Sequence, residues 1–505
     1  MSNTKNVLEW LDSAAENTPN AMAFSDESQD VSFGELSAIT SSIGTALAQQ
    51  VGSESKPVAV IIDRNVQSVC AFLGVAASGN FYVPIDATLP PARIQAILEQ
   101  MQPAAVINTC EDIPSGIDWG KTTPIPFGEL AACACDLELL ASIRKAALDT
   151  NPLYAICTSG TTGVPKGVLI SHRSVVDFIP IFAETFGLSS RDIIGNQAPF
   201  DFDVSVKDIY TALYCGASVH IIPKKCFAMP KLLVSELCER KTTVIIWAVS
   251  ALSVVAGFKA FKHDAPETIR TVMFSGEVMP VKHLKYWQET LPNATFINLY
   301  GPTEITCNCM YYVVDRDFSD DERLPLGIPF DNERIYVLNE NNAPICPGEA
   351  GEICVAGTCL ALGYYRNPER TAQAFVQNPL NDLFPELIYR TGDLARYNER
   401  GELVYASRKD FQIKHMGHRI ELEELEVHMN AIANVDRACC IFDEPRNKIV
   451  ACYAGDIQRE DIVAALGEKL PKYMIPNVFH QLDALPITKN GKIDRKALKE
   501  EYCGS

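Results

Sequence analysis

Residues 153–167 read Leu-Tyr-Ala-Ile-Cys and then Thr158-Ser-Gly-Thr-Thr-Gly-Val-Pro-Lys166-Gly167. The first part has the composition of a buried strand, and the second gathers hydroxyl groups and glycines around one lysine. Glycines let the backbone turn with positive φ and bring N–H groups close to an anion, while hydroxyls and the lysine add donors and charge. A strand that runs directly into such a loop predicts a polyphosphate site in an α/β protein.

This loop differs from the common nucleotide-binding pattern G-x-x-x-x-G-K-[ST]. That pattern, counted from Gly160, needs a glycine before the lysine and a hydroxyl residue after it, whereas the chain has Pro165-Lys166-Gly167. The alternative is a flexible surface turn, which would explain the small polar residues. It would not explain their concentration, with a lysine, directly behind a buried strand.

Apolar runs elsewhere alternate with a helical pattern. Strand-like runs occur at 58–62, 104–107, 219–222 and 243–246, and residues 91–102 have the helical period. Such alternation is typical of βαβ units whose parallel sheets are covered on both faces. The predicted fold class is therefore α/β.

The pattern changes in the last third of the chain. Short strand-like runs separated by turn residues begin at about residue 330, as at 334–338 and 351–357. The polar stretch Ser407–Asp410 then precedes a charged helical pattern from Glu421 to about Ile432 and a strand-like run at 449–453. We predict a large domain over 1–409, β-rich from about 330, and a small α+β domain over 410–505.

Composition limits the function classes. The chain has 505 residues, 47% apolar content and a net charge of −19, which argues against nucleic-acid or anionic-membrane partners. No leader-like segment begins the chain, and the longest apolar stretch, around 244–257, is too short to cross a bilayer. The seventeen cysteines show no metal-binding spacing and are interpreted as reduced thiols. A cytoplasmic location without membrane insertion is expected.

Seven further segments accompany the loop, and together they resemble the adenylate-forming enzymes. This superfamily includes acyl-CoA synthetases, adenylation domains of nonribosomal peptide synthetases and D-alanine:carrier-protein ligases. The collinear segments are 77–86, 158–167, 202–205, 298–304, 351–352 with 363–365, 389–393, 408–421 and 490–495. The resemblance implies ATP-dependent activation of a carboxylate as an acyl-adenylate, followed by attack of a thiol.

The resemblance also assigns catalytic roles. Lys492 matches the lysine that bridges the carboxylate and the α-phosphate, a role that suits a point charge. Glu304 matches the ligand of Mg²⁺, and Thr303 would meet the α-phosphate. Without the motif, Lys492 would be a solvated surface lysine, and Thr303 with Glu304 would begin a helix. The implied cofactors are ATP and Mg²⁺.

Residues that would bind the nucleotide follow from the same motifs. Tyr300 would stack on adenine, Asp393 would accept from the ribose hydroxyls, and Arg408 would lie near ribose and phosphate. Alternatively, Tyr300 is a buried structural tyrosine, Asp393 caps a loop, and Arg408 forms a surface ion pair. The predicted nucleotide-binding set is Thr158, Ser159, Gly160, Thr161, Thr162, Gly163, Lys166, Tyr300, Asp393 and Arg408.

Asp203 indicates the substrate class. In adenylation domains an aspartate at this place pairs with the α-ammonium of an amino acid, whereas the alternative is a helix N-cap, with Ser205 as a rival. The other pocket positions follow from their distance in sequence to the family's motifs. They are Val204, Lys207, Leu252, Met273, Ser275, Leu299, Cys307 and Asn308. Most are apolar, which favours a neutral amino acid. Lys207 either pairs with Asp208 or meets a polar or anionic substrate side chain, and we favour the structural role.

The resemblance implies a moving C-terminal domain. Asp410 matches the hinge, preceded by Ser407 where relatives usually have glycine, and Gly417 and Arg419 match the loop used in the thioester step. The predicted enzyme is an amino-acid-adenylating ligase that loads the phosphopantetheine thiol of a carrier protein, with no carrier segment recognisable in this sequence. Alternatives are a D-alanine:carrier-protein ligase, an acyl- or aryl-CoA synthetase, and a catalytically silent scaffold.

Overall fold

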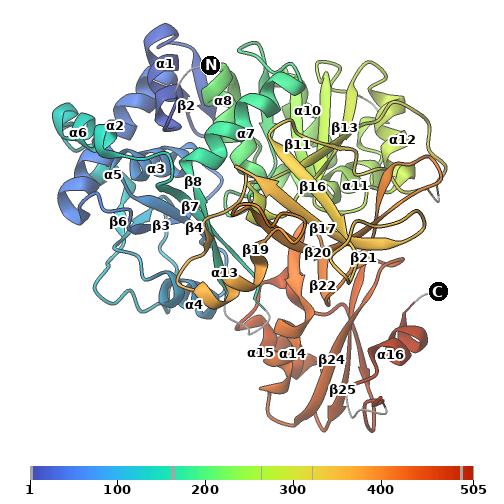
Figure 1. Cartoon of the computed structure of the whole chain (residues 1–505). Coiled ribbons are helices and arrows are strands. Elements are labelled where there is room, and N and C mark those ends of the chain that lie inside the picture. The colour runs from blue at the N-terminus through green and yellow to red at the C-terminus, as the bar shows by residue number, and fades with distance from the viewer. Residues whose placement is uncertain (1–3, 161–164, 263, 321, 489–492, 504–505) are drawn as a thin grey trace.

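The computed structural model describes residues 4–160, 165–262, 264–320, 322–488 and 493–503. Two large sheets lie side by side in the upper part of Figure 1, and a third, antiparallel sheet lies in front of and below them. Residues after 410 form the lower part of the molecule in this view, which we call the C-terminal part. The mixed α/β architecture confirms the predicted fold class.

The first sheet contains the strand that leads into the glycine-rich loop. In spatial order its strands within the described chain are β18 (Gly363–Tyr364), β8 (Lys166–Ser171), β7 (Pro152–Thr158), β4 (Phe81–Asp86), β3 (Pro57–Ile62), β5 (Ala105–Asn108) and β6 (Ile125–Pro126). Strands β7, β4, β3, β5 and β6 are parallel, and β8 and β18 join antiparallel. The helices in this region are α1 (Leu8–Asn17), α2 (Phe33–Val51), α3 (Val66–Ala77), α4 (Pro91–Met101), α5 (Phe127–Ala131) and α6 (Leu137–Ala146).

The second sheet is parallel at its centre. Its described strands, in spatial order, are β15 (Ile328–Pro329), β14 (Met310–Val313), β13 (Thr295–Tyr300), β12 (Thr271–Ser275), β11 (Val244–Ala248), β9 (Ile193–Asn196), β10 (Ser218–Ile221), β1 (Met22–Ser25) and β2 (Asp30–Ser32). The accompanying helices are α7 (His172–Thr185), α8 (Val204–Cys215), α9 (Lys224–Ala228), α10 (Pro230–Glu239), α11 (Val249–Gly257), the short η1 (Ala260–Lys262) and α12 (Val281–Thr290).

The β-rich region is an antiparallel sheet. It comprises β16 (Glu333–Leu338), β17 (Ala350–Gly357), β20 (Leu387–Tyr397), β19 (Phe375–Gln377) and β21 (Leu403–Arg408), with α13 (Pro368–Ala374) between β18 and β19. In the C-terminal part, β22 (Gln412–His415) and β23 (His418–Glu421) form a hairpin. It is followed by α14 (Leu422–Asn430), β24 (Val435–Asp443), β25 (Lys448–Gly455), α15 (Arg459–Gly467), η3 (Lys472–Met474), β26 (Val478–Gln481) and α16 (Arg495–Tyr502).

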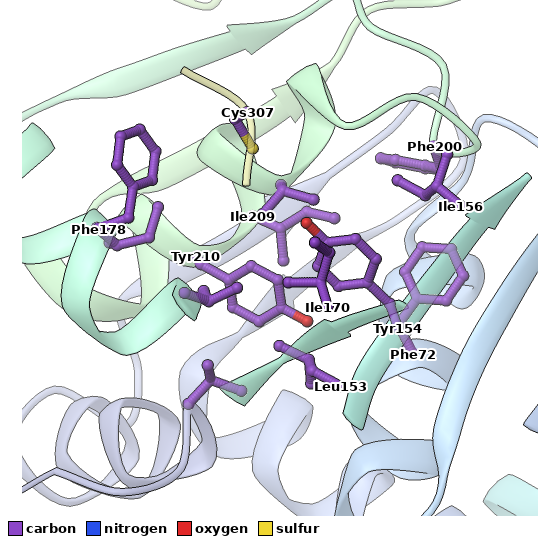
Figure 2. Packing of buried hydrophobic residues seen from close by; sticks show 14 of the residues in the cluster. Phe72, Leu153, Tyr154, Ile156, Ile170, Phe178, Phe200, Ile209, Tyr210 and Cys307 are labelled. Atoms are coloured by element: carbon purple, nitrogen blue, oxygen red, sulfur yellow. The ribbon is translucent and has the colours of Figure 1, made fainter. Parts of the chain in front are cut away.

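The main hydrophobic core lies between the two large sheets. Tyr154 of β7 packs there with Ile209 and Tyr210 of α8, and Phe72 of α3 completes the cluster (Figure 2). The buried hydroxyls of Tyr82 and Tyr210 lie 3.0 Å apart and satisfy each other. Helix α8 is thus joined to the first sheet through this cluster and the Tyr82–Tyr210 contact.

The observed elements confirm the predicted strands and helices with shifts of a few residues at their ends. The run at 243–246 belongs to β11, and the predicted helix at 91–102 is α4. The charged helix is shorter than predicted, because the hairpin strand β23 includes Glu421 and the helix ends at Asn430. All seventeen cysteines are free. Among the described residues, none of the helices combines the length and apolar character that crossing a membrane requires.

Gly327 and Gly401 give a matched test of the packing beside β14. Both have a positive φ, +87° and +75°, but a Cβ on Gly327 would lie 1.8 Å from the Tyr311 carbonyl oxygen, while Gly401 has no heavy atom within 4 Å. Gly401→Ala should lower the free energy of unfolding by about 1–2 kcal/mol, from backbone strain alone. Gly327→Ala should lower it by at least about 3 kcal/mol, because the new side chain also clashes with Tyr311. Urea unfolding of the two variants measures the difference, and equal losses would contradict this packing.

Candidate functional site

Glu304 lies at the centre of a buried charge cluster. It follows β13 through Gly301 and Pro302 and belongs to the 3₁₀ turn η2 (Thr303–Ile305), and its carboxylate is 0% exposed. The Tyr364 hydroxyl donates to Oε1 over 2.8 Å, and Lys166 Nζ lies 3.5 Å from the same oxygen. Arg419 Nη1 donates to Oε2 over 2.7 Å. Two cations therefore surround one buried carboxylate.

The protonation states in this cluster follow from burial and charge. Burial alone would raise the pKa of Glu304, but Arg419 and Lys166 together hold it well below the usual range. Burial, with repulsion from Arg419, lowers the pKa of Lys166 to about 8, and the attraction of Glu304 only partly offsets this. The Glu304 carboxylate is therefore ionised at neutral pH, whereas the Lys166 ammonium titrates at a pH close to neutral.

A second polar cluster forms where β20 and β21 pair. Asp393 lies opposite Arg408 in the strand register, and Arg408 Nη1 donates to Asp393 Oδ1 over 2.7 Å. The Tyr300 hydroxyl donates to Asp393 Oδ2, also over 2.7 Å. The same guanidinium forms a bidentate pair with Asp410 over 2.6 and 2.8 Å. Arg408 thus ties the predicted ribose ligand to the predicted hinge residue.

Asp203 lies immediately before helix α8. Its side chain makes no capping hydrogen bond, and Ser205 Oγ donates backwards to the Phe202 carbonyl over 2.7 Å, so neither residue acts as the cap. Burial raises the pKa of Asp203, with opposing contributions from Lys207 and from a hydrogen bond with Thr303. The carboxylate is costly to ionise at this place without a further cationic partner.

The β22–β23 hairpin is docked against the glycine-rich loop. Ser159 Oγ donates to the Arg419 carbonyl over 2.7 Å, and the Gly417 N–H donates to Glu277. Gly417 has a φ of +82°, and a Cβ there would lie 3.2 Å from Ser250 Oγ. A side chain at Gly417 would therefore be both strained and crowded.

Further contacts join the C-terminal part to the rest of the molecule. Arg93 of α4 pairs with Glu424 of α14 at 2.5 Å, with side chains 9% and 0% exposed. The His418 ring stacks on Tyr473 with centroids 3.4 Å apart and lies perpendicular to the Phe202 ring, with centroids 4.7 Å apart. Burial lowers the pKa of His418 to about 3, so the ring is neutral.

A cavity of about 120 Å³ lies between these groups. The predicted site residues that line it are Thr158, Ser159, Asp203, Val204, Ser275, Thr303, Cys307, Asp393, Arg408, Gly417 and Arg419. Gly160 and Asp410 lie beside it, while Glu304, Lys166 and Tyr300 contact its lining from behind. Lys207, Leu252, Met273, Leu299 and Asn308 are buried outside the lining. Leu252 packs in a different hydrophobic cluster from Met273 and Leu299.

Four predicted residues, Thr161, Thr162, Gly163 and Lys492, lie outside the described residues. The described segments that flank Lys492, 478–488 and 493–503, contribute no residue to the lining of the cavity. Arg495, close to Lys492 in sequence, instead pairs with Glu426 of α14 over 2.5 and 2.6 Å. The described flanks of the predicted catalytic lysine therefore lie away from the cavity.

Sequence reasoning missed several residues of the cavity, including Arg93, Gln412, Lys414 and Tyr473. Lys414 is half-buried, with Nζ 5.8 Å from the centre of the Tyr300 ring, and desolvation lowers its pKa. The alternation Gln412-Ile413-Lys414 was a usable signal, because it places both polar side chains on one face of a strand. Arg93 was equally visible as an arginine beside Ile94 in the apolar stripe of a helix.

The arrangement combines sites for an anion and a cation. The basic side chains Lys166, Arg408, Lys414 and Arg419 gather on the side of Asp393 and Glu304, whereas Asp203 offers a carboxylate to a cation at the start of α8. In the described chain, His, Cys, Asp and Glu side chains form no group of three or more that could hold a metal. Glu304 could offer Mg²⁺ one carboxylate, with phosphate oxygens as the remaining ligands.

Comparison with known proteins matches residues 11–365 to the family described as AMP-binding enzyme. Tyrocidine synthase 1 of Brevibacillus parabrevis is 32% identical over 98% of this chain and 45% of its own length. Gramicidin S synthase 1 of Brevibacillus brevis is 31% identical over 98% of this chain and 44% of its own. The chain therefore spans less than half the length of these two relatives.

A third relative is matched along nearly its whole length. The D-alanine--D-alanyl carrier protein ligase of Bacillus cytotoxicus (strain DSM 22905 / CIP 110041 / 391-98 / NVH 391-98) is 31% identical over 98% of this chain and 99% of its own. Among solved structures, holo-PA1221, an NRPS protein with adenylation and PCP domains, has a TM-score of 0.84 at 23% identity, covering 98% and 84% of the two chains. IdnL1 has a TM-score of 0.79 at 26% identity, covering 96% and 100%. These findings confirm the resemblance inferred from the motifs: the chain belongs to the AMP-binding enzyme family.

Proposed function

We propose that this protein activates an amino acid with ATP, forming an aminoacyl-adenylate and pyrophosphate, and transfers the aminoacyl group to the phosphopantetheine thiol of a carrier protein. The named relatives include peptide synthases and a carrier-protein ligase, which supports this reaction class. The carrier protein is then the macromolecular partner, and a cytoplasmic location suits a reaction that consumes ATP.

The observation that carries the amino-acid assignment is the Asp203 carboxylate. It lines the cavity, and burial raises its pKa, with no ion pair among the described residues to compensate. A substrate α-ammonium supplies the missing cation and restores the ionised carboxylate, because an opposite charge nearby favours the charged form. A fatty or aryl acid offers no such cation, which argues against the acyl- and aryl-CoA synthetase alternative.

The nucleotide is assigned to the opposite side of the cavity. Asp393 accepts from two protein donors and has lone pairs left for ribose hydroxyls, while Arg408 and Thr303 face the cavity as donors toward phosphate. Such donors stabilise charge that develops at the α-phosphate when the substrate carboxylate attacks. The presence of all these groups argues against a silent scaffold.

Mg²⁺ is assigned to Glu304. A magnesium ion bound there would neutralise phosphate charge during adenylation. In the docked arrangement Arg419 already donates to Oε2 of Glu304, and Lys166 and Tyr364 contact Oε1. The carboxylate becomes available to a metal when the hairpin that carries Arg419 withdraws.

The docked hairpin suggests how one cavity serves two steps. Residues 1–409 and 410–505 act as two domains that rotate about Asp410, whose carboxylate is held by Arg408. The docked arrangement, with Gly417 beside Glu277, suits thiol transfer. Adenylation requires Lys492 at the cavity, and the described segments on either side of it contribute nothing to its lining.

A D-alanine:carrier-protein ligase is the second candidate, favoured by the relative that is matched along 99% of its length. The deciding measurement is amino-acid-dependent ATP–pyrophosphate exchange across D- and L-amino acids, with fatty and aryl acids as controls. We expect exchange with amino acids alone. Exchange with D-alanine alone would favour the second candidate, and exchange driven only by fatty or aryl acids would contradict the amino-acid assignment.

Lys492→Ala should lower pyrophosphate exchange by about 10²-fold or more, because it removes an electrostatic contact made in the transition state. Lys496→Ala is the matched control, since that lysine is 86% exposed and pairs with Glu500 on α16. Exchange rates of the two purified variants are compared with the parent. Undiminished exchange in Lys492→Ala would contradict the catalytic assignment.

Glu424→Gln should slow thiol transfer about tenfold or more while changing pyrophosphate exchange less. The substitution weakens the buried pair with Arg93, and a hydrogen bond to a charged group is worth about 1.5–3 kcal/mol. Glu426→Gln is the control, because Glu426 pairs with Arg495 within the C-terminal part. Single-turnover loading of a carrier measures transfer, and equal effects of both substitutions would contradict a specific role of this contact in docking.

A further inference from the structure

We infer that the amino-acid side-chain pocket ends at Cys307 and accepts a small, uncharged side chain of the size found in glycine, alanine or serine. This inference rests on the proposed function, because it takes Asp203 as the partner of the substrate ammonium. Besides Asp203, three of the predicted pocket residues belong to the cavity lining, namely Val204, Ser275 and Cys307. These residues come from α8, from the end of β12 and from the turn after η2.

A strained backbone places the Cys307 thiol in this wall. Thr306 and Cys307 have φ values of +56° and +76°, a region that L-residues with side chains rarely occupy. The Cys307 thiol lies 3.1 Å from the Asp203 carbonyl oxygen and donates to it. The thiol therefore covers the backbone at the start of α8, next to the carboxylate that would hold the substrate. Strain of this kind persists where the surroundings fix it and is frequent in ligand sites.

The surroundings of this turn hold it in place. Thr306 Oγ1 donates to the Cys359 carbonyl over 2.7 Å, and the Cys309 N–H donates to the Tyr300 carbonyl over 2.8 Å. A Cβ on Gly301 would lie 2.5 Å from the Asn308 Cα, so the two segments are in close contact. The wall is consequently rigid, and a longer substrate side chain cannot push Cys307 aside without breaking these contacts.

The space behind Cys307 is filled. Lys207 is 0% exposed and Asn308 1% exposed, neither lines the cavity, and Lys207 Nζ donates to Asn308 Oδ1. Ile209 of α8 is also buried, and Figure 2 shows Cys307 above it at the edge of the main core. The described residues therefore leave no second compartment behind Cys307 for a branched or aromatic side chain.

The charges around the wall favour an uncharged substrate side chain. Lys207 is attracted by Asp203 and Asp208 and is separated from the cavity, so it offers no exposed counterion to an acidic side chain. The arginines that line the cavity, Arg93, Arg408 and Arg419, are each paired with a carboxylate. Lys414 also lines the cavity, and Asp393 and Asp203 attract its ammonium. Among the described residues, each cation of the lining therefore already faces a carboxylate, with which an acidic substrate side chain would have to compete.

Two cysteines two residues apart provide a matched test. Cys307 and Cys309 are 3% and 0% exposed, but only Cys307 contributes to the described lining of the cavity. Pyrophosphate exchange is measured with glycine, both alanine enantiomers, serine, 2-aminobutyrate, valine, phenylalanine and glutamate. The parent should respond to the small uncharged members. Cys307→Ala should raise kcat/KM for 2-aminobutyrate relative to the best small substrate at least tenfold, because one methylene in a pocket is worth about 10- to 200-fold.

Cys309→Ala should change that ratio less than twofold. Cys307→Gly, which suits the φ of +76°, serves as the second variant if Cys307→Ala fails to fold. A parent preference for glutamate, valine or phenylalanine would overturn the inference, as would equal shifts in Cys307→Ala and Cys309→Ala. Absence of exchange with every amino acid would instead overturn the proposed function, and this inference with it.

Discussion

The buried carboxylate of Glu304 determines how several distant segments must meet. A fully buried charge is tolerated only with partners, and its partners come from β8, β18 and the β23 strand of the hairpin. Lys166 belongs to the strand after the glycine-rich loop, and Tyr364 belongs to the edge strand of the first sheet. Arg419 belongs to the C-terminal part, so Glu304 joins all three segments. Satisfying one charge thus brings three distant segments together beside the cavity, and Arg419 also lines it.

Local patterns predicted the fold well because they carry their own physical signal. The apolar run in β3 and the helical period of α4 depend on residues close in sequence, and so do the turn residues of the β-rich sheet. The docking of α14 on α4 was not predictable in this way. The Arg93–Glu424 pair joins residues 331 positions apart, and each residue alone is an ordinary member of a charged or amphipathic helix.

The candidate site was predictable in part for a similar reason. Motif positions identified Asp203, Glu304, Asp393 and Arg408, which the structure brings around one region. Distance from the motifs in sequence placed Leu252 and Met273 in the same pocket. Such a distance does not tell which side chains reach a cavity and which pack behind its wall. The positive φ of Thr306 and Cys307 left no trace in the sequence, because neither residue type favours that conformation.

The position of Cys307 has a chemical consequence. A cysteine beside an activated acyl group would ordinarily risk becoming acylated itself, since the thiolate attacks mixed anhydrides readily. Burial raises the pKa of Cys307 strongly, and the nearby Lys207 only partly opposes this. The sulfur is held as a neutral thiol that donates to a carbonyl oxygen. In the proposed reaction, the Cys307 sulfur can therefore shape the pocket without competing with the carrier thiol for the activated acyl group.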